Sequence, residues 1–216
     1  LTYNQDLPFF LHGINKPVVL RSQNEIVFTL PGMLALSGVS KSIAVSCNSL
    51  PMLQMNEVGL PLSFAIRQLL SQNSLEYAQT FLEAIPLAIP QNFLVAAPEG
   101  IMGFEVSQNT VSPYSAEHAS YLYHTNFPVL NQDYKYAKYQ APTCQRYKAI
   151  ETFMKEKDET FELSTQQLID LFSTNPLNND ETFLRFTVSY SNQSKEFPSV
   201  QFINPKQNNT STLLTF

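Results

Sequence analysis

The chain has 216 residues, of which 44% are hydrophobic, 12% aromatic and 14% charged, with a formal net charge of −5. A chain of this length can bury roughly two thirds or more of its unfolded surface, so we expect one domain over residues 1–216. Its scattered Lys and Arg residues argue against a nucleic-acid partner, and no apolar stretch reaches the roughly 20 residues of a membrane-spanning helix, so we expect no membrane partner.

The two cysteines and three histidines do not form a recognisable metal or disulfide pattern. Cys47 and Cys144 are too few for a disulfide framework. His12, His118 and His124 lie far apart in the sequence, without the spacing of zinc ligands. We therefore expect neither a metal nor a cofactor.

The first half of the chain predicts strands followed by a pair of helices. Residues 17–32 contain two β-rich runs joined by a polar turn, and residues 42–50 predict a buried strand with a polar tip. The period then changes to that of a helix over residues 61–70. Ser74 has the position of an N-cap for a second amphipathic helix, which ends before Pro86.

The next part predicts strands and then helices. Three strand-like runs come first, at residues 92–97, 102–106 and 120–124. A helix is expected over residues 143–155. Ser164 and Gln167 have the spacing of a capping box for a helix over residues 166–172.

The chain ends in a predicted hairpin formed by residues 183–190 and 199–205. Strands therefore occur in groups and do not alternate singly with helices. This grouping favours an α+β fold with packed layers over a βαβ arrangement.

Several hydrophobic runs end in polar side chains that could carry chemistry. They are Asn4-Gln5-Asp6, Asn48 after a buried strand, Asn126, and Arg146 at the start of a predicted helix. Taken singly, each Asn also has an ordinary structural interpretation, because Asn tolerates turn conformations and satisfies backbone groups.

Together these segments resemble the penicillin acyltransferase family and the related choloylglycine-type hydrolases of the N-terminal-nucleophile (Ntn) hydrolase superfamily. The similar motifs follow one another along nearly the whole chain: the N-x-D segment at 4–6, Gly38 through SIAVSCNSL, the helix GLPLSFAIRQLL with Arg67, His124-Thr125-Asn126-Phe127-Pro128, and Arg146. The five motifs occur in the same order as in that family.

The resemblance implies a four-layer αββα sandwich and an enzyme that hydrolyses or transfers a linear amide. In this family the nucleophile is a Cys at the mature N-terminus, and its own α-amine accepts the thiol proton. No Ser-His-Asp triad is then required. The implied substrate is a small-molecule amide or acyl donor with an apolar part, and self-cleavage is implied as well.

The resemblance also implies roles for four residues. Asn48 and Asn126 would donate hydrogen bonds to the oxyanion of the acyl-transfer intermediate. Asp6 would hold the α-amine of the nucleophile. Arg146 would support the nucleophile or neutralise a substrate carboxylate.

The family nucleophile would lie about twenty residues before the N-x-D segment, upstream of Leu1. The expectation is therefore an N-terminally truncated chain, one chain of a processed pair, or an inactive relative. We interpret Cys47 as a buried structural thiol and Cys144 as a surface or half-buried one. Lys41-Ser42 depart from the Gly that the family prefers before the Asn48 strand.

Three interpretations remain open: an Ntn-type enzyme, a non-catalytic binding relative with the same fold, and an α+β domain whose Asn-ended strands are coincidental. For His124, we favour a hydrogen-bonded scaffold over contact with substrate. The spatial test is whether Asp6, Asn48, Asn126 and Arg146 converge at one cleft. The sequence predicts no oligomeric state.

Overall fold

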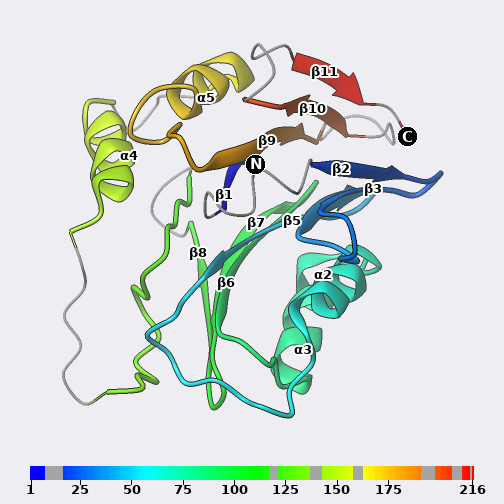
Figure 1. Ribbon diagram of the computed structural model, residues 1–216, viewed down its shortest axis with the longest axis vertical. Helices are drawn as coiled ribbons and strands as arrows, with labels where there is room; N and C mark the ends of the chain where they lie inside the picture. The colour runs from blue at the N-terminus through cyan, green and yellow to red at the C-terminus, as the bar shows by residue number, and fades with distance from the viewer. Residues whose placement is uncertain are drawn as a thin grey trace.

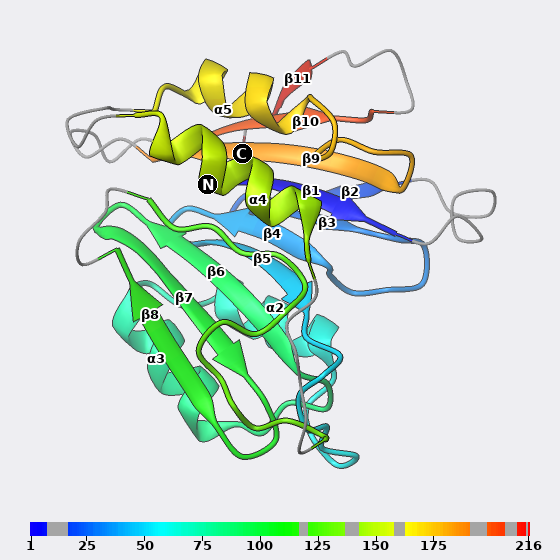
Figure 2. The same ribbon diagram turned by 90° about the vertical axis from the view of Figure 1, so that its left-hand side faces the viewer.

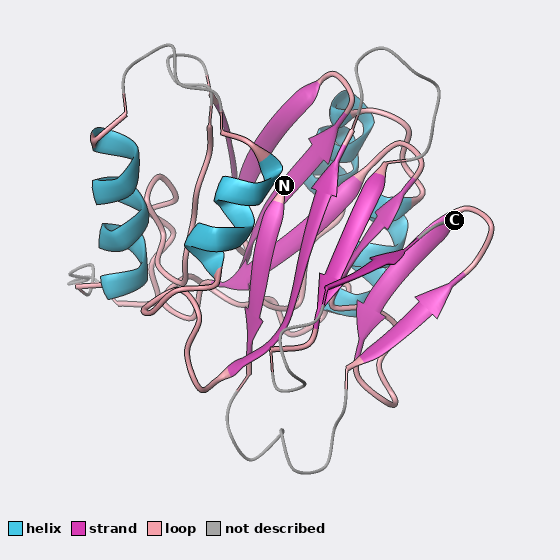
Figure 3. Ribbon diagram, turned by 90° about the horizontal axis from the view of Figure 1, so that it is seen from above, coloured by secondary structure: helices cyan, strands magenta, loops and turns pink. Residues whose placement is uncertain are grey.

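A computed structural model describes residues 1–7, 17–116, 121–136, 143–157, 163–190, 198–205, 211–214 and 216. Two antiparallel sheets are stacked face to face, with helices on both outer faces (Figures 1 and 2). Seen from above, the strands of both sheets run in similar directions (Figure 3), as in aligned sheet packing. The predicted α+β fold with four αββα layers is confirmed.

The larger sheet has seven strands that follow one another in chain order. They are β2 (Val18–Arg21), β3 (Glu25–Thr29), β4 (Ser37–Ser40), β5 (Ala44–Ser49), β6 (Gln91–Ala97), β7 (Gly100–Val106) and β8 (Val111–Ser115). Each strand pairs antiparallel with the next. Asn48 therefore lies opposite Asn92, and Asn92 lies opposite Glu105.

The smaller sheet joins the two ends of the described chain. Its order is β1 (Thr2–Asp6), β9 (Thr182–Ser189), β10 (Ser199–Ile203) and β11 (Ser211–Leu214). Tyr3 of β1 pairs with Phe186 of β9. Among the described residues β1 pairs with β9 alone, which makes β1 an edge strand.

The helices form the outer layers. On the larger sheet lie α2 (Leu62–Leu70) and α3 (Leu75–Ala84); α5 (Thr165–Phe172) packs on β1 and β9, and α4 (Gln145–Lys155) lies beside it (Figure 2). The Ser74 side chain accepts a hydrogen bond from Tyr77 N, and Ser164 with Gln167 forms the predicted capping box. No helix in the described part of the chain combines the length and apolarity needed to cross a bilayer.

The core between the sheets is built around stacked aromatic rings. Phe28 of β3 is fully buried and lies 4.7 Å from Phe186 and 5.6 Å from Phe202, measured between ring centroids. A second core lies between the larger sheet and α2 and α3, where Ile66, Leu69 and Leu82 are buried. Burial of these apolar side chains is the main term that holds the four layers together.

The turn before the Asn48 strand forms without the family's Gly. Ser40 Oγ accepts hydrogen bonds from Ser42 N and Ile43 N, and Ser40 N donates to Ile43 O at 2.7 Å. Gly38 is needed for a different reason. A Cβ there would lie 2.9 Å from Ile26 O and 2.7 Å from Leu70 Cδ1, so only Gly allows β4 to pack this closely.

Most predicted elements are confirmed, and one is wrong. Residues 121–124, the described part of the strand expected over 120–124, form no strand. Their side chains are anchored to other elements, with His124 bonded to Glu105 of β7 and Tyr123 packed on Tyr147 of α4. Side-chain anchoring replaces backbone pairing here.

Candidate active site

The Arg146 guanidinium joins two of the predicted site residues. It lies in the first turn of α4, and its Nη1 donates to Asp6 Oδ2 at 2.9 Å. Its Nη2 donates to Asn126 Oδ1 at 2.8 Å. Both hydrogen bonds are charge-assisted because the guanidinium donor is a cation, and such bonds are stronger than neutral ones. Arg146 thus fixes the end of β1 relative to residue 126.

Asn126 in turn reaches the end of β5. Its Nδ2 lies 3.3 Å from Ser49 O and 3.4 Å from Ser49 Oγ, next to Asn48. Asn48 and Arg146 both line one cavity of about 800 Å³. Asp6 and Asn126 are not among the residues that line this cavity, but both are bonded to Arg146, which does line it.

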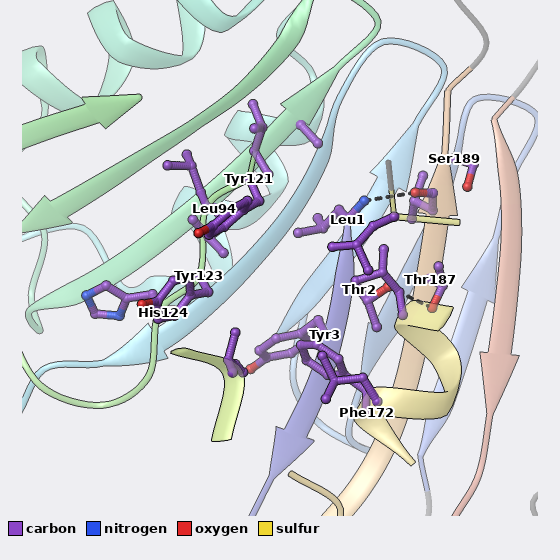
Figure 4. A pocket seen from close by; sticks show the side chains of 18 of the residues that line it. Leu1, Thr2, Tyr3, Leu94, Tyr121, Tyr123, His124, Phe172, Thr187 and Ser189 are labelled. Carbon is purple, nitrogen blue, oxygen red and sulfur yellow. Dashed lines mark hydrogen bonds between the residues drawn. The ribbon is translucent and has the colours of Figure 1, made fainter. Parts of the chain in front are cut away.

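The cavity lies between the two sheets at the side covered by α4 and α5. Leu1, Thr2, Tyr3 and Phe172 line one side, and Leu94, Tyr121, Tyr123 and His124 line the other (Figure 4). Ile150 and Met154 of α4 contribute further apolar surface. Apolar and aromatic side chains with a few polar groups are typical of a small-molecule site.

Asp6 is held by three side chains. Its Oδ1 accepts from Thr182 Oγ1 at 2.9 Å, and Asn179 Nδ2 lies 3.4 Å from Oδ2, which also receives Arg146. Burial raises the pKa of Asp6, while the charge of Arg146 and the hydrogen bonds from Thr182 and Asn179 offset part of that shift. Arg146 is therefore the largest of the groups that favour the ionised form of Asp6.

Replacing Arg146 with Ala should raise the pKa of Asp6 further. When the pKa of Asp6 is higher in the folded state than in the unfolded state, the folded state favours protonated Asp6. The contribution of Asp6 to stability is then fully present below the unfolded-state pKa and is lost as the pH rises through the folded-state pKa. We expect Arg146→Ala to lose more stability at neutral pH than near pH 3.8, the ordinary pKa of Asp, in urea unfolding at several pH values. Arg146→Lys, which keeps the cation, should lose less, and an equal loss at every pH would contradict this account.

Tyr3 is a site residue that the sequence did not reveal. It is buried, and its hydroxyl donates to Cys47 O at 2.6 Å, next to Asn48. Burial raises the pKa of Tyr3 well above its ordinary value, so the hydroxyl stays a donor. Through this bond β1 of one sheet fixes the end of β5 in the other.

His124 has the hydrogen bonds expected of a scaffold residue, and its ring also lines the cavity. Its ring is buried, with Nε2 2.7 Å from Glu105 Oε1 and Nδ1 2.6 Å from Thr125 O. Glu105 is fully buried in β7 and was not anticipated. Both ring nitrogens are therefore engaged within the fold.

The two cysteines differ in environment. Cys47 is buried, its Sγ donates to Leu36 O at 3.4 Å, and burial raises its pKa to about 12. Cys47 is therefore buried, as expected of a structural thiol, and a thiol with this pKa stays protonated at neutral pH. Cys144 is half-buried at the N-cap position of α4.

Thiol labelling should separate the two. We expect iodoacetamide to modify Cys144 in the folded protein and Cys47 only after unfolding, because Cys47 lacks both exposure and thiolate. Peptide mass spectrometry before and after addition of urea measures this order. Labelling of Cys47 at the rate of Cys144 in the folded protein would contradict the burial described.

Within the described ranges, no group of three or more His, Cys, Asp or Glu side chains is arranged to hold a metal ion. His12 and His118 lie outside those ranges.

Comparison with known proteins gives a family match and matches among solved structures. The profile of the family described as acyl-coenzyme A:6-aminopenicillanic acid acyl-transferase matches residues 38–195, which include Asn48, Asn126 and Arg146 but not Asp6. Among solved structures, the Caenorhabditis elegans N-acylethanolamine-hydrolyzing acid amidase (NAAA) ortholog is similar over 99% of this chain and 94% of that chain, with a TM-score of 0.61 and 17% sequence identity. No curated protein sequence matches. The fold is therefore of the Ntn-hydrolase type, and the chain belongs to the acyl-coenzyme A:6-aminopenicillanic acid acyl-transferase family.

Proposed function

We propose that this chain forms the main part of a linear-amide hydrolase or acyltransferase in which Asp6, Asn48, Asn126 and Arg146 serve a cysteine nucleophile. The observation that carries the proposal is the Arg146 guanidinium, which joins Asp6 and Asn126 beside a cavity that Asn48 also lines. Three segments distant in sequence meet there. If the Asn residues at the strand ends were coincidental, there would be no reason for these segments to meet.

The two carboxamides suit the stabilisation of a tetrahedral oxyanion. Arg146 occupies Oδ1 of Asn126, which leaves Nδ2, the donor end, turned toward Ser49 and the end of β5. Asn48 lines the cavity at the same strand end. Preorganised neutral donors of this kind typically contribute about 3 kcal/mol each to the transition state.

We place the nucleophile on a segment that precedes Leu1 in the complete protein. Cys47 is buried and protonated, and Cys144 has no α-amine beside it. Leu1, Thr2, Tyr3 and Asn4 line the cavity, and within the described residues β1 has a partner strand on one side only. A preceding strand paired with the free side of β1 would extend the smaller sheet of the 1–216 domain and bring a thiol beside Asp6.

In the proposed reaction, the thiol proton passes to the α-amine of the same Cys and the sulfur attacks the amide carbonyl. Asn48 and Asn126 donate to the oxyanion while Asp6, kept ionised by Arg146, holds the α-ammonium. Collapse breaks the C–N bond, and the leaving amine takes the proton. Water or an acceptor amine then attacks the thioester and regenerates the thiol.

The cavity indicates the acyl side of the substrate. Its lining is dominated by apolar and aromatic side chains such as Leu94, Tyr121, Ile150, Met154 and Phe172. Such a surface favours an acyl group with a substantial apolar part through burial of that surface. We extend the proposal to self-cleavage that exposes the Cys as a new N-terminus.

The proposal is tested on the full-length protein by mass spectrometry after incubation with an N-acyl amide. We expect a new N-terminal Cys and a hydroxylamine-sensitive acyl adduct on that Cys. Cys47→Ser and Cys144→Ser should both keep the adduct. Binding of the amide without any adduct would support a non-catalytic binding relative, and an adduct on Cys144 would overturn the placement of the nucleophile.

A further inference from the structure

A buried carboxylate fixes the segment that carries Asn126. Glu105 of β7 is 0% exposed, and its Oε1 accepts from Val129 N at 2.6 Å and lies 2.7 Å from His124 Nε2. Its Oε2 accepts from Leu130 N at 2.9 Å and from Asn131 N at 2.6 Å. We call Glu105 with these four groups the Glu105 clamp. It holds the chain on both sides of residue 126.

Both nitrogens of the His124 ring contact hydrogen-bond acceptors. Its Nδ1 lies 2.6 Å from Thr125 O, a carbonyl that can only accept a hydrogen bond. Its Nε2 lies 2.7 Å from a carboxylate that already accepts three backbone N–H groups. A neutral imidazole carries one N–H and satisfies only one of the two contacts, whereas an imidazolium satisfies both.

We infer that His124 is held as an imidazolium by anionic Glu105, and that this buried ion pair is a positioning device for Asn126. The role assigned to Asn126 rests on the proposed function, but the protonation of His124 does not. Neither Glu105 nor His124 is a catalytic residue in this account, because neither is bonded to the groups proposed to react.

The surroundings of the pair favour the charged form. Burial alone would raise the pKa of Glu105, but the hydrogen bonds from His124, Asn131, Val129 and Leu130 outweigh it, and its pKa lies below its ordinary value. A carboxylate bonded in this way remains an anion, and a cation is then the matching neighbour for it inside the protein.

The other titratable groups near the pair are neutral or bonded elsewhere. Tyr114 of β8 has its ring centroid 6.1 Å from that of His124 and donates its hydroxyl to Asn92; burial and then the charge of Glu105 raise its pKa. Asp133 is bonded to Ser107 and Asn109. Tyr123 is packed against Tyr147, with a pKa raised first by burial, and Arg146 is bonded to Asp6 and Asn126.

The clamp determines where Asn126 can lie. His124 is bonded two residues before Asn126, and Val129 three residues after it, to the same carboxyl oxygen. Asn131 adds hydrogen bonds from its Nδ2 to Glu105 O at 3.0 Å and Thr110 O at 3.2 Å. The loop between these anchors is short, so its position follows from β7, and Arg146 meets Asn126 at a fixed point.

The direct test is ¹⁵N NMR of the imidazole nitrogens in full-length protein labelled with ¹⁵N-histidine, with the His124 signals identified by their loss in His124→Gln. We expect both His124 ring nitrogens to be protonated at neutral pH. One protonated and one bare ring nitrogen would overturn the inference. The NMR measurement requires no enzymatic activity, so its result remains valid if the proposed function is wrong. An active enzyme with a neutral His124 would overturn the inference about His124 and leave the proposed function intact.

The positioning role is tested with Glu105→Gln. We expect His124 to lose one ring proton and the amides of Val129, Leu130 and Asn131 to exchange markedly faster with solvent. We expect kcat to fall by about 100-fold with little change in KM, the typical effect of misplacing a reacting group by about 1 Å. The matched control Glu83→Gln changes an exposed Glu on α3 and should change none of these.

If Glu105→Gln does not fold, His124→Gln provides the second variant, because its amide can still donate to the intact carboxylate. It should speed exchange of the same three amides and lower kcat in the same direction. Unchanged exchange and unchanged kcat in either folded variant would contradict the positioning role.

Discussion

Replacing Asn48 with Ala is expected to lower kcat of the full-length enzyme by about 100- to 1,000-fold, with a much smaller change in KM. Asn48 is the penultimate residue of β5 and lines the cavity, where we propose that its amide donates to the developing oxyanion. The loss corresponds to about 2.7–4 kcal/mol of transition-state stabilisation. Steady-state kinetics on an N-acyl amide, with a thermal midpoint to verify folding, measure it.

The matched control is Asn73→Ala. Asn73 is exposed in the turn between α2 and α3 and is not among the residues that line the cavity. It should leave kcat unchanged. Asn48→Asp keeps the shape but places a carboxylate where the oxyanion forms, so it should be at least as harmful as Asn48→Ala. A folded Asn48→Ala enzyme with kcat near the wild-type value would remove Asn48 from the reaction.

Replacing Phe28 with Ala is expected to lower the free energy of unfolding by about 3–5 kcal/mol. The ring is 0% exposed and stacks against Phe186 and Phe202, which face each other in the β9–β10 pair, with interplanar angles of 17° and 7°. Its removal leaves a cavity where the two sheets meet, and it removes two aromatic contacts. Urea unfolding followed by circular dichroism provides the measurement.

Leu20→Ala controls for the hydrophobic-to-Ala change in the same hairpin. Leu20 of β2 is 45% exposed, so its loss should change stability by no more than about 0.5 kcal/mol. Phe28→Leu should fall between the two. A Phe28→Ala protein destabilised by less than about 1 kcal/mol would show that the sheets do not depend on this ring for their packing.

Local signals in the sequence predicted local structure well. The capping box of Ser164 and Gln167 and the N-cap at Ser74 depend on groups three residues apart, and both form as expected. The β2–β3 hairpin likewise depends on a short polar turn, in which Ser22 N donates to Glu25 O. Such features are visible in sequence because their partners are neighbours along the chain.

Long-range pairing was not visible in the same way. β1 reads as a short polar segment and becomes a strand because β9 pairs with it near the other end of the chain. β4 has the sequence SGVS, which has little strand character, and it forms between β3 and β5, where Gly38 allows close packing. β8 contains Pro113, which an edge strand tolerates.

Site residues, like strands, were hard to predict where they depend on long-range contacts. Asp6, Asn48, Asn126 and Arg146 were identified because they resemble family motifs, and the fold brings them together. Tyr3 and Glu105 lie inside strands and match no motif. Glu105 did leave a signal, since a Glu within the apolar run IMGFEV predicts a buried charge that needs partners. Its partners came from a segment whose path the sequence did not reveal.

The most direct test of the central claim is a crystal structure of the full-length protein acylated by a thiol-reactive substrate analogue. Our account predicts that the acyl group lies in the cavity lined by Asn48 and Arg146, with its carbonyl oxygen about 3 Å from the Nδ2 atoms of Asn48 and Asn126. The modified sulfur should lie near Asp6, on a strand paired with β1. An acyl group bound elsewhere, or a carbonyl oxygen distant from both amides, would contradict the account.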